Sequence, residues 1–73
     1  QDYALAMGWF RQAADLGHHK AQTNLGMMLW IGRGCGRDRD SAIHWLKEAA
    51  RKNYEPAQEL LLEIRRKNGA SQR

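Results

Sequence analysis

The chain has 73 residues, which is long enough for one small domain whose core only marginally offsets the loss of chain entropy on folding. Its net charge is +4. A single cysteine excludes an intrachain disulfide, and one thiol cannot assemble a zinc site, so stability has to come from packing. No apolar run approaches membrane-spanning length, so we expect no transmembrane segment.

The first predicted element is a helix over about residues 2–16, with Asp2 as its N-cap and Gly17 just after its last turn. Its apolar residues recur at three- and four-residue spacing, which is the period of a helix facing a core. These residues are Tyr3, Ala6, Met7, Phe10, Ala13 and Ala14.

A second helix is predicted over about residues 20–31, with Ala21, Leu25, Met28 and Leu29 on one side. It ends before residues 32–36, because three glycines in five residues cannot continue a helix. This loop lacks the Lys-Ser/Thr pair of a phosphate-binding loop and follows a helix instead of a strand, so we interpret it as a turn.

A third helix is predicted over about residues 38–52, capped by Asp38 or Asp40, and Asn53 follows it because asparagine tolerates a left-handed turn. A fourth helix is expected over about residues 56–67, with Pro56 in its first turn, where a missing N–H is no loss. Residues 68–73 are expected to form a flexible tail. The inward residues are Ala42, Ile43, Trp45, Leu46, Ala49 and Ala50 in the third helix and Ala57, Leu61 and Ile64 in the fourth.

The two helix pairs are copies of each other, because residues 2–31 return as residues 38–67. Chance would give about two identical pairs at typical residue frequencies. Internal repeats of this kind usually bind other molecules and do not catalyse. The identical pairs are Asp2/Asp38, Ala6/Ala42, Trp9/Trp45, Ala13/Ala49, Ala14/Ala50, Ala21/Ala57, Gln22/Gln58 and Leu25/Leu61.

The adjacent alanines in each copy allow a neighbouring helix to approach closely. We expect Trp9 and Trp45 to cover the wedge between helices, so removing either indole should cost about 3–5 kcal/mol.

These residues resemble the Sel-one-like repeat, a family of helix pairs related to the tetratricopeptide repeat, with the pattern A-x-x-W-[YF]-x-x-A-A-x-x-G-x-x-x-A-Q-x-x-L-G-x-M-Y-x-x-G-x-G-V-x-x-D. The resemblance covers about residues 2–64 and implies an all-α fold of antiparallel helix pairs stacked as a short right-handed α-solenoid. The first copy supplies Ala6, Trp9, Phe10, Ala13, Ala14, Gly17, Ala21, Gln22, Leu25, Gly26, Met28, Gly32, Gly34 and Asp38, and the second supplies Ala42, Trp45, Ala49, Ala50, Ala57, Gln58 and Leu61.

The fourth helix departs from the pattern, because Leu62 stands where the first copy has Gly26, and Arg65 and Arg66 replace apolar residues. A charged outer face suits a terminal helix. The chain also begins in the second helix of the family's usual unit, so we expect residues 1–67 to be the C-terminal part of a longer array. So short a piece is expected to self-associate through Tyr3, Met7 and Phe10.

The resemblance further implies a non-catalytic scaffold or adaptor without cofactor or small-molecule substrate, which binds a protein or peptide on a concave face lined by the second and fourth helices. Asn24 would hydrogen-bond a peptide backbone, whereas Leu60 at the equivalent position does not repeat that donor. Met27 and Trp30 either offer adaptable apolar area to a partner or pack under the glycine loop. The candidates are Lys20, Asn24, Met27, Trp30, Ile31, Leu60, Glu63 and Lys67.

Two further features carry weaker hypotheses. His18 and His19, with Asp15 nearby, lack a spaced third ligand, which favours a structural or solvent role over a metal site. Cys35 has no evident cation or helix N-terminus to activate it and no histidine placed as a base, which argues against an enzyme. A lone cysteine suits a reducing cytosol slightly better than an exported location, and the composition leans weakly towards bacteria.

The alternative function is a basic surface that binds an anionic polymer or membrane, centred on the dense basic run near the end of the chain. Cations near a helix C-terminus are also favourable on their own account, and nucleic-acid binders usually show a broader basic face. The residues concerned are Arg65, Arg66 and Lys67, with Arg37, Arg39 and Arg73.

Overall fold

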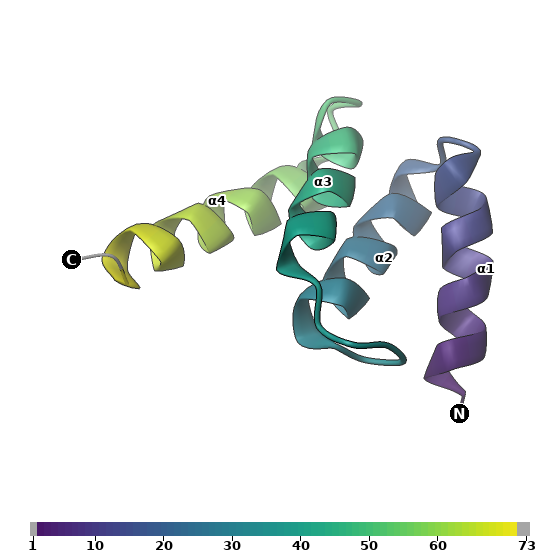
Figure 1. Ribbon diagram of the computed structural model, residues 1–73. Helices are drawn as coiled ribbons and strands as arrows, with labels where there is room; N and C mark the ends of the chain where they lie inside the picture. Colours follow the sequence, from purple (N-terminus) through teal and green to yellow (C-terminus); the bar gives the residue numbers. More distant parts are fainter. Residues whose placement is uncertain (1, 72–73) are drawn as a thin grey trace.

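The computed structural model describes residues 2–71, with side chains described for residues 2–67, and these residues form four helices and no strand (Figure 1). The helices are α1 (Tyr3–Asp15), α2 (His19–Ile31), α3 (Arg39–Ala50) and α4 (Glu55–Ser71). The first three begin and end within about two residues of the ranges expected from helical periodicity. The predicted all-α repeat fold is confirmed.

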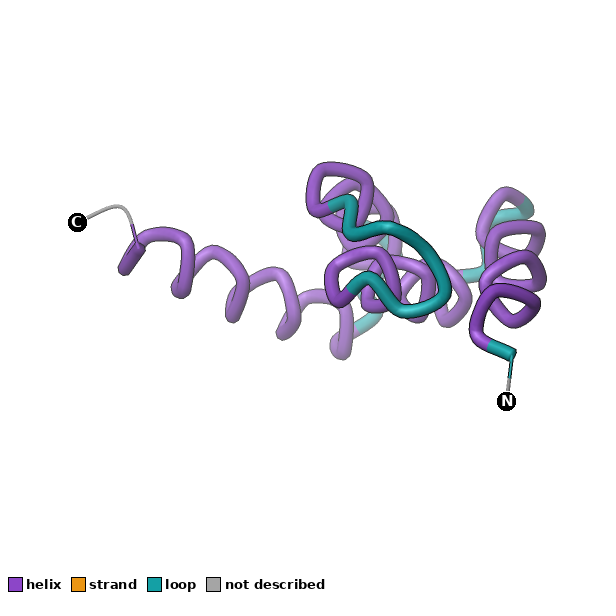
Figure 2. The backbone as a smooth tube through the Cα atoms, turned by 60° about the horizontal axis from the view of Figure 1, so that its bottom comes forward, coloured by secondary structure: helices purple, strands orange, loops and turns teal. Residues whose placement is uncertain are grey.

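Helices that follow each other in the sequence also pack against each other. α2 lies between α1 and α3, and α4 packs on the other side of α3 (Figure 1). Figure 2 shows that the C-terminal part of α4 extends beyond the other helices. The core therefore sits around α2 and α3, which each have a neighbour on both sides.

The helix starts are fixed by the predicted aspartate caps. The Asp2 carboxylate accepts a hydrogen bond from the Leu5 N–H at 3.1 Å, and Asp38 accepts one from the Ser41 N–H at 3.1 Å. The Ser41 hydroxyl also donates to Asp38 at 2.8 Å. The backbone bond first, and then the hydroxyl bond, hold the pKa of Asp38 below its usual value.

The turn after α1 needs a left-handed residue, and Gly17 supplies it with φ of 92°. Its N–H donates to the Ala14 carbonyl at 2.9 Å, while the His18 N–H donates to the Ala13 carbonyl at 3.2 Å, which is a Schellman C-cap. Asn53, with φ of 62°, takes the same conformation after α3, as predicted. The predicted left-handed conformation is therefore confirmed at both turns.

The core has two parts that share Trp30. The larger part joins α1, α2 and the start of α3, and the smaller part joins α3 and α4. Trp30, at the C-terminal end of α2, packs against both. The larger part contains Met7, Ala14, Ala21, Leu25, Met28, Leu29 and Ala42, and the smaller part contains Leu46, Leu61 and Ile64.

α2 and α3 approach each other most closely at Gly26. A Cβ atom at this position would lie 2.8 Å from the Leu46 Cγ and 3.1 Å from the Ala42 carbonyl oxygen. Both distances are shorter than normal carbon contacts, so only glycine fits there without a shift. Leu62, the equivalent residue of α4, is 58% exposed and makes no such approach.

The glycine loop after α2 is held against the start of α1. Gly34 has φ of 81°, and a Cβ atom there would lie 2.6 Å from the backbone carbonyl of Tyr3. The Arg33 guanidinium lies 4.8 Å from the centre of the Tyr3 ring, which is a cation–π contact. The loop is thus a turn, as expected, and it also positions Arg33.

Trp9 does not cover a wedge between helices, contrary to the prediction, because its side chain is 65% exposed. Trp45, its equivalent, is half-buried against the larger core. The difference arises because α3 lies between two helices, whereas α1 packs mainly on α2, and Trp9 lies on the α1 surface beside Leu5, Gly8 and Gln12. The other exposed large apolar residues of α1 are Tyr3, Leu5 and Leu16.

This difference makes a testable contrast between two identical residues at equivalent positions. We expect Trp45→Ala to lower the free energy of unfolding by about 2 kcal/mol or more, because a half-buried indole loses its packing. Trp9→Ala should change it by about 0.5 kcal/mol or less. Urea denaturation followed by circular dichroism measures both, and equal losses would contradict the packing described here.

Two other expectations are also wrong. Residues 68–71 are helical and not a flexible tail, because one glycine among helix formers costs only about 1 kcal/mol and does not break α4. Residues 72 and 73, the rest of that predicted tail, lie outside the described part of the chain. Met7, which was expected to take part in self-association, is buried in the core at 6% exposure and is therefore not available on the surface for it.

Candidate partner-binding face

A groove between α2 and α4 contains most of the residues that the sequence singled out for partner binding. We call it groove 2; its volume is about 180 Å³. Six of the eight predicted residues line it, and Leu46 and Ile64 form the rest of its lining. The six are Met27, Trp30, Ile31, Leu60, Glu63 and Lys67.

A second groove lies on the other side of α2, against α1. We call it groove 1; its volume is about 310 Å³. Asn24 lines this groove and not groove 2, whereas Met27 and Ile31 line both. Lys20, although exposed, lines neither. The remaining residues of groove 1 are Tyr3, Ala6, Phe10, Met28 and Arg33.

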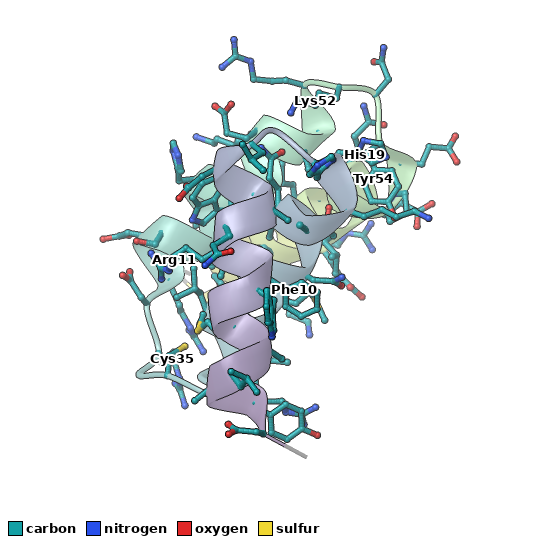
Figure 3. All side chains as sticks on the ribbon, turned by 90° about the vertical axis from the view of Figure 1, so that its right-hand side faces the viewer. Phe10, Arg11, His19, Cys35, Lys52 and Tyr54 are labelled. Atoms are coloured by element: carbon teal, nitrogen blue, oxygen red, sulfur yellow. The ribbon has the colours of Figure 1, made fainter. Side chains whose placement is uncertain are left out.

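Groove 1 was not predicted from the sequence, because its α1 residues were assigned to core packing and self-association and its loop residues to a turn. Figure 3 shows Phe10 and Arg11 leaving α1 on opposite sides, with Cys35 on the Arg11 side. Phe10 is half-buried and forms part of the groove wall. The repeat itself held the signal, because Phe10 is equivalent to Leu46 of groove 2.

Met27 and Trp30, for which two roles were open, differ in burial. Met27 is 37% exposed on the ridge that separates the two grooves. Trp30 is half-buried in the core, yet one edge lines groove 2, and the Arg39 guanidinium lies 4.5 Å from its ring centre. Met27 is therefore accessible to a partner, while Trp30 combines packing with groove lining.

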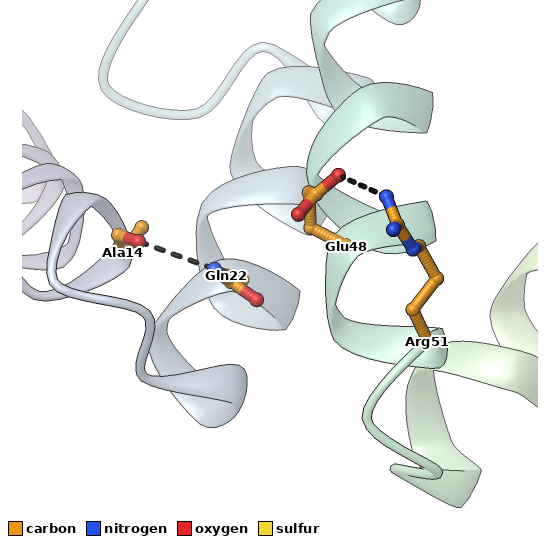
Figure 4. Close-up of polar contacts among 4 residues, drawn as sticks. All are labelled: Ala14, Gln22, Glu48 and Arg51. Carbon is orange, nitrogen blue, oxygen red and sulfur yellow. Dashed lines mark hydrogen bonds and ion pairs between the residues drawn. The ribbon is translucent and has the colours of Figure 1, made fainter.

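Gln22 and Gln58, which the sequence analysis noted only as an identical pair of the repeat, each hydrogen-bond the preceding helix through their side chains. The buried Gln22 side chain donates from Nε2 to the Ala14 carbonyl at 3.2 Å (Figure 4). Gln58 makes the equivalent bond to the Ala50 carbonyl at 3.1 Å. Each bond ties the end of one helix to the next helix, so the groove walls are held in fixed relative positions.

The histidines and the cysteine lie apart from both grooves. Figure 3 shows His19 beside Tyr54, with Lys52 near them, and the two ring centres are 4.5 Å apart. The Lys52 ammonium donates to the Gly17 carbonyl, which joins the two helix-connecting turns.

Cys35 is half-buried, with its Sγ atom 3.9 Å from the Met28 carbonyl oxygen. Among the described side chains, no three His, Cys, Asp or Glu residues gather as a possible metal site.

Acidic side chains lie beside the basic run of α4. A shallow surface depression on this helix is lined by Arg66 together with Glu59, Glu63 and Leu62. Arg65 and Arg66 are exposed. Alternating signs on one helix face reduce the potential that an anionic polymer would meet. None of the described helices is both long and apolar enough to cross a bilayer.

Known proteins resemble this chain over part of its length. DAP3-binding cell death enhancer 1 from Mus musculus is 50% identical over 42 residues, which are 58% of this chain and 8% of that protein. The Rattus norvegicus protein of the same name is 48% identical over 42 residues, with the same coverage of both chains. Uncharacterized protein NMB1327 of Neisseria meningitidis serogroup B is 54% identical over 33 residues, which are 45% of this chain and 7% of that protein.

The family model of the Sel1 repeat matches residues 1–18 and 19–54, which together are most of the chain. The second segment runs from α2 through the glycine loop and α3, whereas neither segment includes the body of α4, where Leu62 and the charged residues depart from the pattern. Repeats of this family generally mediate protein–protein interactions. The helix packing, the repeated glutamine hydrogen bonds and these matches together place the chain in the Sel1 repeat family.

Proposed function

We propose that this chain is a non-catalytic interaction module, a scaffold or adaptor, that binds a peptide or a partner surface on the face formed by α2 and α4. The observation that carries the proposal is groove 2, whose lining includes six of the eight residues that the sequence predicts for partner binding. A groove with apolar walls and a charged rim has the make-up of a binding patch with a few dominant anchors.

The relatives are consistent with such a role. The name of the mouse and rat proteins describes binding to DAP3. The segment that matches this chain is 8% of the length of those proteins. The basic surface is the second candidate, and the acidic residues beside Arg66 make it the weaker one.

A pair of charge-introducing variants tests the proposal. Ile31 lines both grooves and is 51% exposed, so Ile31→Glu should block the face with little effect on folding. Leu62, also exposed, lines neither groove and serves as the matched control with the same charge change. Peptides selected from a random library on the parent chain should bind Ile31→Glu about tenfold or more weakly, and Leu62→Glu equally well.

Fluorescence anisotropy at low and high salt reads out the result. Equal binding by parent and both variants would rule out this face as the site. Binding that disappears at high salt in parent and Leu62→Glu alike would instead favour the basic surface, because contacts with polyanions release counterions.

A further inference from the structure

Grooves 1 and 2 are the same site in two successive repeats. Five residues of groove 1 correspond, 36 positions later, to five residues of groove 2. Each groove is lined by residues from both helices of one pair, α1 and α2 for groove 1 and α3 and α4 for groove 2. The pairs are Phe10/Leu46, Asn24/Leu60, Met27/Glu63, Met28/Ile64 and Ile31/Lys67.

The two grooves share a ridge and differ in charge. Met27 and Ile31 border both, so a ligand that crosses this ridge contacts the two grooves at once. Among the described residues, Arg33 is the only charged one that lines groove 1, and its guanidinium is held over the Tyr3 ring. The rim of groove 2 carries both an acid and a base, Glu63 and Lys67. An acidic group is therefore favoured specifically at groove 1.

From this arrangement we propose that the face binds an extended acidic peptide that places one large apolar side chain in each groove and a carboxylate against Arg33. The inference rests on the proposed function and specifies its ligand. Packed helices lie about 8–10 Å apart, so the two grooves should be separated by about that distance. An extended chain in the polyproline II conformation advances about 3.1 Å per residue and has three residues per turn, so side chains three residues apart lie on the same side of the peptide at about this separation.

Asn24 favours an extended ligand over a helical one. Its side chain is exposed in groove 1, where an amide offers both a donor and an acceptor. The backbone groups of an extended peptide are available to such an amide, whereas those of a helix are already bonded internally. The second groove has Leu60 at this position, so backbone contact is expected at groove 1 only.

The affinities of synthetic fluorescent peptides for the full chain test this inference. Each contains two phenylalanines separated by one, two, three or four serines, followed by a glutamate or, as a control, a glutamine. We expect the tightest binding with two serines, a loss of about tenfold when either phenylalanine becomes alanine, and weaker binding of the glutamine peptide.

Two variants fill the grooves separately, since Asn24 and Glu63 are exposed and each lines only one of them. Asn24→Trp and Glu63→Trp should each weaken the best peptide about tenfold. Glu63→Trp should have little effect on the peptide that lacks the groove 2 phenylalanine, whereas Asn24→Trp should still weaken the peptide that lacks the groove 1 phenylalanine, by less than tenfold, because it also removes the backbone hydrogen bond. Arg33→Glu should weaken the glutamate peptide more than the glutamine peptide.

Affinity that does not depend on spacing, or that responds to only one of the two filling variants, overturns the two-groove inference while leaving the proposed function standing. The same holds if none of these peptides binds but library peptides remain sensitive to Ile31→Glu. If library peptides also ignore Ile31→Glu, the proposed function fails together with the inference.

Discussion

Replacing Gly26 by leucine should destabilise the chain by about 3 kcal/mol or more, because the new side chain has no space at the closest approach of α2 and α3. A Cβ atom alone would lie 2.8 Å from Leu46 and 3.1 Å from the Ala42 carbonyl oxygen, which belongs to the backbone and cannot rotate away. Leucine gains only about 1 kcal/mol in helix propensity over glycine. The midpoint of urea unfolding measures the difference.

The reciprocal change, Leu62→Gly, is the natural control, because it exchanges the same two residues at the equivalent position of α4. Leu62 is 58% exposed, so its loss should cost only the helix propensity, about 1 kcal/mol. If Gly26→Leu proved as mild as Leu62→Gly, α2 and α3 would not be packed as closely as described.

Leu46→Ala should lower the free energy of unfolding by about 2–5 kcal/mol. This side chain is 1% exposed, contacts Gly26 of α2, and packs with Leu61 and Ile64 of α4, so its removal leaves a cavity where three helices meet. Leu5→Ala, at an exposed position of α1, should change stability by about 0.5 kcal/mol or less. Comparable losses for the two variants in chemical denaturation would contradict the assignment of Leu46 to the core.

Local chemistry made most of the fold predictable. Asp2, Gly17 and Asn53 mark helix ends through caps and left-handed turns, and each occupies the conformation that its residue type suggested. The end of α4 was not predictable in the same way, because a single glycine such as Gly69 is found both just after the end of a helix and within a helix. The exposure of Trp9 depends on which helices lie beside α1, and no local pattern carries that information.

The candidate face was predictable to the extent that it belongs to helix surfaces. Ile31 and Glu63 were expected on one face because the family resemblance implies that the second and fourth helices line it, and the two residues do line one groove. Groove 1 depends on how α1 crosses α2 and on how the glycine loop folds back towards Tyr3. Such angles between elements follow from side-chain packing over the whole core, so sequence periodicity alone does not give them.

The most direct test of the proposed binding face is nuclear magnetic resonance of the chain titrated with a selected peptide, observing the methionine methyl, tryptophan indole and backbone amide signals. The proposed face predicts saturable shifts of the Met27 methyl and the Trp30 indole, with the Trp9 indole unchanged, because Trp9 lines neither groove. Shifts confined to Trp9 or to the backbone amides of Arg65 and Arg66 would place the site elsewhere and contradict the account.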